Sequence, residues 1–300
     1  MPYVQTKRST DLSRMMGQEQ LIAAYKEACK VDVEAFKPGN VSVYSEGHGM
    51  TVADFILSAE VSAHPISNPE FTLGQKIYYA VKATRAAVGC NTNLGILLLC
   101  APVCQAFYQK KPGQNLAAVL AQVLENTTLK DAEWVFKAIT LAAPGGLGES
   151  SEQDVTEAAA INLTEAMRIA SEKDRIAWQY ITNYKDIFDF AILRYNSSLV
   201  EYGDSNWAAV SVYTGFLSQF PDSHIERKYG DRHSGWVLEQ MITVDNALAN
   251  TDNPKQYIPM LHEVDRRFKE KSINPGTTAD LTVATVFIIL VEALSVRCTS

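Results

Sequence analysis

The sequence lacks an excess of basic charge. Its 300 residues include 27 Lys and Arg against 34 Asp and Glu, which gives a formal net charge of −7. Proteins that bind duplex nucleic acid usually carry a basic patch or stripe on one face. We therefore expect no nucleic-acid partner, although a few local cations are enough to hold a small anionic ligand.

Paired cysteines are absent as well. The five cysteines are odd in number, follow no metal-ligand spacing and fall mostly in apolar runs. Buried free thiols are typical of proteins in a reducing compartment. The pattern predicts a cytoplasmic protein without structural disulfides or a cysteine-bound metal.

We also expect neither a secretory signal nor a membrane anchor. Residues 1–14 are polar and have no apolar core of the kind that signal peptides contain. The apolar runs 94–103 and 281–296 fall short of the ~18–20 residues that a membrane-spanning helix needs. Both runs are predicted to be buried core helices, and no membrane partner is expected.

The chain shows no strand-type alternation, no hairpin dipeptide between strand-like runs and no internal repeat. Apolar residues such as Leu21, Tyr25 and Ala28 recur at spacings of three and four, which is typical of amphipathic helices. We predict an all-α fold, with a single compact multi-helix domain over residues 16–300 and a flexible N-terminal arm over residues 1–15. The ligand site is expected in loops at helix ends. Helices are predicted near residues 18–36, 51–63, 73–88, 94–103, 116–124, 132–143, 152–184, 188–195, 207–220, 235–248, 257–271 and 281–296.

Four polar, glycine-bearing turns interrupt the helical pattern. They are KPGNVS at 37–42, NTNLG at 91–95, PGGLG at 144–148 and NPGTTAD at 274–280. In the first, Pro38 disfavours helix at Lys37, and Gly39 allows backbone angles closed to other residues, so the first helix must end there. Taken alone this turn is ordinary loop chemistry. Together, the four turns are predicted to converge on one site for a phosphate-rich ligand.

Side chains beside these turns are further candidates. Asp32 falls on an otherwise apolar stripe one turn before Lys37. It is either a solvated residue at the edge of the stripe or a ligand held toward the site. His48 lies in the glycine-rich GHGM at 47–50, where a lone histidine is usually just a polar loop residue. The connection 221–230, with two adjacent cations, is either solvated surface or a segment that closes over a polyphosphate.

Two helix starts are also candidates, and the first is more polar than capping needs. Asn91, Thr92 and Asn93 place three hydrogen-bonding side chains before an apolar helix, where an N-cap requires one. Thr277 or Thr278 is a natural N-cap for the last helix. Helix N-termini attract anions, so both starts are candidates for phosphate binding.

Six of these pieces, in this order, resemble the triphosphoribosyl-dephospho-CoA synthase family. They are KPGNVS at 37–42, His48 with Met50, Asn91 with Thr92, PGGLG at 144–148, DRIA at 174–177 and the stretch 275–281. The resemblance runs from about residue 20 to the end of the sequence. It departs from the usual pattern at Asn93 and Leu94, where His and Lys are typical, at Gly49, where an acidic residue is typical, and at Asp32, where Glu is usual. These versions look like a divergent subgroup found in archaea and methylotrophic bacteria.

The resemblance implies an ATP-dependent enzyme. Such an enzyme transfers the 5′-triphosphoribosyl group of ATP to an acceptor hydroxyl, of dephospho-CoA in the family, and releases adenine. One alternative is phosphoribosyl or triphosphoribosyl transfer to a pterin-type or aromatic acceptor in the synthesis of a one-carbon cofactor such as tetrahydromethanopterin. The other is a nucleotide-binding protein without catalysis. Homodimer formation is left open.

The resemblance also suggests roles for individual residues. The catalytic candidates are Asp32, Lys37 and Asp280. Mg²⁺, which prefers carboxylate and phosphate oxygens, is assigned to Asp32, Asp154 and Asp280, although which of them holds metal and which acts as base stays open. The nucleotide is assigned to Lys37, Asn40, Ser42, His48, Asn91, Thr92, Asn93, Gly145, Gly146, Thr277 and Thr278.

Overall fold

The computed structural model describes residues 2–143 and 159–297, with the backbone alone for 2–13 and 295–297. The helices are α1 (Pro2–Glu34), α2 (Val52–Ser67), α3 (Leu73–Val88), α4 (Leu94–Gln109), α5 (Leu116–Glu125), α6 (Leu129–Ala142), α7 (Leu163–Ala170), α8 (Arg175–Ile181), the π-helical η1 (Ile187–Ala191), α9 (Ile192–Tyr202), α10 (Ser205–Leu217), α11 (Ser223–Tyr229), the 3₁₀-helical η2 (Gly230–His233), α12 (Ser234–Ala249), η3 (Pro254–Tyr257), α13 (Ile258–Glu270) and α14 (Gly276–Arg297). Within the described ranges there are no strands, only the bridges Ser42–Ser45 and Gly47–Met50. The all-α prediction is confirmed.

Local signals explain most helix starts. Capping boxes, in which two residues three apart bond each other's backbone N–H groups, begin α2, α3, α6 and α7. At the other end of α3, Gly89 takes the left-handed conformation that C-terminal glycines favour. Such signals are short in range, and for this reason they can be read from the sequence.

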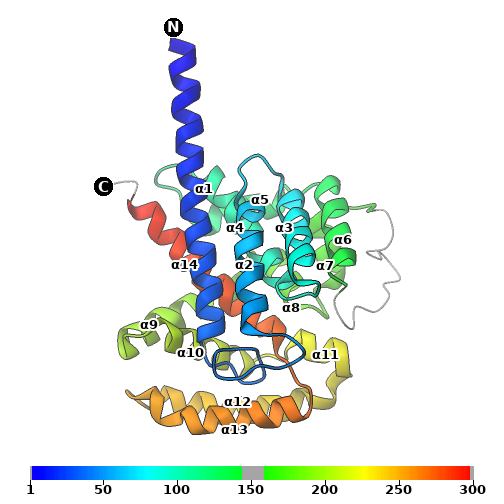
Figure 1. Cartoon of the computed structure of the whole chain (residues 1–300), viewed down its shortest axis with the longest axis vertical. Coiled ribbons are helices and arrows are strands. Elements are labelled where there is room, and N and C mark those ends of the chain that lie inside the picture. Colours follow the sequence, from blue (N-terminus) through cyan, green and yellow to red (C-terminus); the bar gives the residue numbers. More distant parts are fainter. Residues whose placement is uncertain (1, 144–158, 298–300) are drawn as a thin grey trace.

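Several predicted boundaries differ from the structure by a few residues, such as the end of α4 at Gln109, and two are wrong by more. Helix α1 begins at Pro2 and not near residue 18, and its first turns extend beyond the other helices in Figure 1. Extending a helix from turns that are already formed adds one hydrogen bond for each residue fixed, so the first turns need no apolar periodicity of their own. The long helix predicted to end at 184 is divided, because Asp174 accepts hydrogen bonds from two backbone N–H groups and starts α8 afresh.

Helix α14 lies at the centre of the fold (Figure 1), packed on α1, α4 and α10. Its window Gly276–Leu294 is apolar enough to cross a membrane, but 67% of it is buried inside the protein. Burial of this extent is typical of a core helix, as predicted for this run. The buried apolar side chains of the described helices form one continuous cluster, so the helices share a single core.

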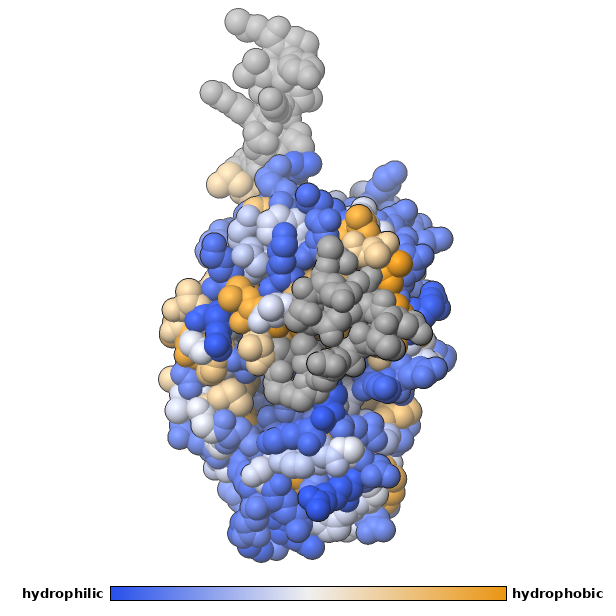
Figure 2. Space-filling model, turned by 90° about the vertical axis from the view of Figure 1, so that its right-hand side faces the viewer, coloured by the Kyte–Doolittle hydropathy of each residue, from blue (hydrophilic) through white to orange (hydrophobic). Residues whose placement is uncertain are grey.

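The lower part of the molecule is polar outside. Helices α12 and α13 lie together there (Figure 1), and Figure 2 shows a mostly hydrophilic surface over this part. Between this layer and the upper helices, several helix ends gather. They are the end of α1 and the starts of α2, α4, α11 and α14, all of which contribute residues to one pocket or flank those that do.

Candidate functional site

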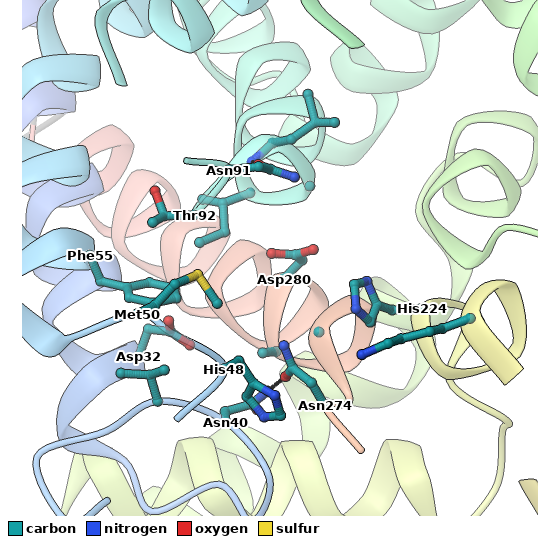
Figure 3. Close-up of a pocket in the computed structure, with 17 residues that line it drawn as sticks. Asp32, Asn40, His48, Met50, Phe55, Asn91, Thr92, His224, Asn274 and Asp280 are labelled. Atoms are coloured by element: carbon teal, nitrogen blue, oxygen red, sulfur yellow. Dashed lines mark hydrogen bonds between the residues drawn. The ribbon is translucent and has the colours of Figure 1, made fainter. Parts of the chain in front are cut away.

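Three of the four predicted turns meet at this pocket. Asn40, Asn91 and Asn274, one from each turn, are among its lining residues. Figure 3 shows Asp32 and His224 on opposite sides of the pocket, with Asp280 between them. The fourth turn, with Gly145 and Gly146, lies outside the described residues, as does Asp154.

Gly39 joins the first turn to the last. Its φ is +88°, and a Cβ there would lie 2.8 Å from Pro275 Cδ and 3.1 Å from the Ile273 carbonyl oxygen. The Gly39 N–H donates to Asp265, and the Tyr213 hydroxyl donates to the carbonyl of Pro38, at 2.8 and 2.6 Å. Only a residue without a side chain allows this contact, which sets the two turns side by side.

Lys37 lies behind the wall of the pocket and not on it. Its side chain is 0% exposed, and Nζ lies 2.6 Å from Asp32 Oδ1 while it also donates to the Asp32 main-chain carbonyl. Asp32 itself is 6% exposed and lines the pocket. Asp32 is therefore no solvated edge residue, and Lys37 supports it from behind.

Asp280 is the second carboxylate of the pocket. Among the described residues none donates a hydrogen bond to it. Burial raises its pKa well above the ordinary value, and the negative charges of Asp32 and Asp222 raise it further, while Arg227 opposes the shift. A carboxylate in this situation favours a proton or a cation nearby.

The polar residues before α4 mostly bond inside the protein. The Asn91 side chain accepts the Leu94 N–H at 3.1 Å and so caps α4, although Asn93 is the residue that immediately precedes the helix. The Thr92 hydroxyl lies 2.5 Å from that of Ser58. The Asn93 amide donates to a buried hydroxyl of α2 at 3.3 Å, and Asn93 is not among the residues that line the pocket. Asn91 and Thr92 do line it.

Thr277, Thr278 and Ser42 also fall outside the lining. Asp222 accepts both the backbone N–H and the hydroxyl of Thr278 at 2.8 Å, and Ser223 donates to Thr277 at 3.0 Å. These bonds join the starts of α11 and α14. The buried Ser42 hydroxyl accepts a backbone N–H from its own turn.

Helix α11 adds residues that were not chosen from the sequence. His224 and Lys228 both line the pocket. Lys228 is the one Lys or Arg among the described residues that line it. Burial, together with the charges of Arg227 and Lys228, lowers the pKa of His224 to about 4. The two adjacent cations at positions 227 and 228 were the feature of the sequence from which this contribution of α11 could have been predicted. Arg227 pairs with Asp174, while Lys228 is exposed to the pocket.

No group of three or more His, Cys, Asp or Glu side chains suited to a metal occurs in the part of the chain that the structure describes. A metal at this site would rest on two carboxylates, Asp32 and Asp280, with ligand oxygens completing its coordination. Mg²⁺ is usually bound in this way, through one or two carboxylates and substrate phosphates.

Comparisons with known proteins identify the family. Residues 18–299 match the family model described as ATP:dephospho-CoA triphosphoribosyl transferase. A crystal structure from Archaeoglobus fulgidus, provisionally assigned as a triphosphoribosyl-dephospho-CoA synthase, is similar with a TM-score of 0.62 and 23% identity, over 78% of this chain and 97% of that one. At that identity the similarity supports the fold and no more specific role. No match was found among proteins with curated descriptions. With nearly its whole length matched by the family model, the chain belongs to the ATP:dephospho-CoA triphosphoribosyl transferase family, a family of transferases.

Proposed function

We propose that this protein transfers the 5′-triphosphoribosyl group of ATP to an acceptor hydroxyl and releases adenine, with dephospho-CoA as the acceptor that the family description names. The observation that carries the proposal is the distribution of charge in the pocket. Asp32 and Asp280 come from α1 and α14, and Lys228 comes from α11. A substrate with a negative polyphosphate and a carbon that becomes positive during reaction complements such a pocket.

The reaction itself defines what the carboxylates do. The bond between C1′ and N9 of ATP breaks, and its electron pair leaves with adenine, while a bond forms between C1′ and the acceptor oxygen. The acceptor hydroxyl loses its proton, and adenine gains one at a ring nitrogen. The ribose becomes positively charged as adenine leaves, and negative groups held close to it stabilise that charge. We assign this role to Asp32 and Asp280.

Lys37 is assigned a positioning role. Its ion pair holds one oxygen of Asp32 at 2.6 Å, which orients the carboxylate without contact to the nucleotide. We assign the phosphates to Lys228. Leu94 follows the Asn91–Thr92 pair at a position where the family usually has a lysine, and Lys228 supplies a positive charge in its place. His224 is largely neutral near pH 7, because its pKa is about 4.

Mg²⁺ would be held by Asp32 and Asp280 together with the phosphates. Burial and then negative neighbours raise the pKa of Asp280, and a bound cation would relieve the repulsion from those neighbours, so the residues present fit the ion. When bound, the ion would neutralise part of the phosphate charge. The orientation of the substrate still depends on the side chains of the pocket.

The test is incubation with Mg-ATP and a panel of acceptors, with free adenine followed by chromatography. We expect adenine release that requires dephospho-CoA and is lost in Asp280→Asn. Release that requires a pterin-type acceptor instead would change the acceptor and keep the reaction. Binding of ATP in calorimetry without adenine release, whatever the acceptor, would overturn the transferase proposal in favour of a nucleotide-binding protein.

A further inference from the structure

His48 is held at the pocket by an unusual turn. The Met50 N–H donates to the Gly47 carbonyl at 3.1 Å, and the two residues between them, His48 and Gly49, have φ of +59° and +71°. Two positive angles are characteristic of a type I′ turn. A left-handed conformation costs a residue with a side chain about 1–2 kcal/mol, and such residues gather at functional sites.

The ring of His48 has a defined tautomer. Nε2 lies 2.8 Å from the Gly39 carbonyl oxygen, and a carbonyl can only accept, so Nε2 carries the proton. Burial is the main cause that lowers the pKa of His48. The hydrogen bond to Gly39 and the charge of Asp265 oppose the shift, while Lys269 and Lys228 act in the same direction as burial. The ring is therefore neutral near pH 7, and Nδ1 is left as an acceptor.

Asn40, next to Gly39, has one atom without a partner. Its Nδ2 donates to Asn274 Oδ1 at 2.5 Å, while its Oδ1 is buried and has no hydrogen-bond partner among the described residues. The side chain is 6% exposed, and a buried polar atom without a partner costs about 1–3 kcal/mol. Figure 3 shows Asn40, His48 and Asn274 grouped at one edge of the pocket.

We infer that Asn40, His48 and Asn274 form a corner that binds the vicinal 2′- and 3′-hydroxyls of the ATP ribose. The corner offers two acceptors to which no described residue donates, the buried Asn40 Oδ1 and His48 Nδ1, and a ribose diol has two O–H donors. A phosphate oxygen only accepts, so it would satisfy neither. The inference rests on the proposed function and adds an orientation to it, with the ribose at this corner and the phosphates toward Lys228.

Calorimetry of the whole protein with ATP, 2′-deoxyATP and 3′-deoxyATP, without acceptor, tests the corner. One lost hydrogen bond to a buried neutral group corresponds to a loss of about 5- to 20-fold in affinity. We expect wild-type protein to bind each deoxy analogue more weakly than ATP by about that factor. For each variant we take the ratio of the dissociation constant of a deoxy analogue to that of ATP. In Asn40→Ala and in His48→Ala, this ratio should fall to about 1 for at least one analogue.

Asn206→Ala is the matched control. Asn206 also has a buried Oδ1 that no described residue bonds, but it lies in a separate cleft with Trp207 and Phe36. This variant should keep the wild-type ratios. Because each ratio is taken within one variant, general weakening or partial unfolding cancels, and His48→Ala remains informative if Asn40→Ala does not fold.

The outcomes separate the corner from the proposed function. Equal affinities of wild-type protein for the three nucleotides, with adenine release intact, overturn the corner alone. Weaker binding of inosine triphosphate than of ATP that disappears in Asn40→Ala would place the adenine amino group there and also overturn the ribose assignment. Absence of any ATP binding would remove the proposed function and the corner with it.

Discussion

The carboxylate of Asp280 lies directly against the backbone of Gly95. A Cβ at position 95 would lie 2.0 Å from Asp280 Oδ2 and 2.5 Å from its Cγ. Both distances are too short for atoms that are not bonded to each other. Gly95 is the second residue of α4, so the absence of its side chain lets a carboxylate from α14 reach the first turn of that helix. The positive end of a helix dipole favours an anion at this place.

Gly95→Ala should displace the Asp280 carboxylate and impair catalysis. A shift of reacting groups by about 1 Å can cost ~100-fold in rate, and we expect a loss of that order in adenine release. Gly235→Ala is the control, because Gly235 is the second residue of α12 and a Cβ there meets nothing within 4 Å. It should keep full activity. Wild-type activity in Gly95→Ala would show that the position of Asp280 does not matter.

Lys37→Met should destabilise the protein, because Asp32 would be left buried without its partner. Breaking one side of a buried ion pair typically costs about 3–5 kcal/mol, measurable by urea unfolding. Adding Asp32→Asn should restore part of the loss. Lys30→Met removes an exposed cation 3.8 Å from Glu34 and should cost less than about 0.5 kcal/mol. A Lys37→Met protein of wild-type stability that has lost ATP binding would instead support direct contact with the nucleotide.

The sequence was sufficient for the all-α fold and for the meeting of three of the four turns, and insufficient for the direction of individual side chains. Pro38, Gly39 and the capping residues act over a few positions, so their consequences follow from local rules. The burial of Lys37 is different. It depends on how the turn at 37–42 packs against α10 and α13, which are distant in sequence, as the bonds from Tyr213 and Asp265 show.

The same distinction applies to the threonines of the last turn and to α11. Thr278 reads as an ordinary N-cap, and only the fold reveals that its hydroxyl bonds Asp222, 56 positions away. Arg227 and Lys228 are adjacent cations that the sequence cannot tell apart. Tertiary contacts pair the first with Asp174 and leave the second at the pocket.

Lys228→Ala should weaken ATP binding by about 10-fold at low salt, because a hydrogen bond to a charged group contributes about 1.5–3 kcal/mol and Lys228 is partly screened by water. The difference from wild type should shrink as ionic strength rises, since salt screens exposed charges. Calorimetry at two salt concentrations measures both effects. Lys130→Ala removes an exposed cation of α6, 4.0 Å from Glu133, and should leave ATP affinity and its salt dependence unchanged. Identical results for the two variants would remove Lys228 from the phosphate site.

His224 should make the folded protein less stable in mild acid. Its pKa is lowered to about 4 in the folded protein, against about 6.5 in an unfolded chain. The unfolded chain therefore binds a proton first as the pH falls. Stability should fall between pH 6.5 and about 4, by up to about 3 kcal/mol. Above pH 6.5 this contribution is constant, because His224 is neutral in both states.

His224→Gln should remove that dependence, because glutamine keeps polar atoms without titrating. Urea unfolding of wild type and variant at pH 8 and pH 5 measures this dependence. Between pH 8 and pH 5, the free energy of unfolding of the variant should rise relative to that of wild type. The raised pKa values of Asp280 and Asp222 act in the opposite direction, since these groups take up protons in the folded protein before the unfolded chain does. Both proteins share these carboxylates, so their effect cancels in the comparison. Parallel stability curves across this range would mean that His224 takes up its proton equally well in the folded and unfolded states, and that its burial does not exclude the charged ring.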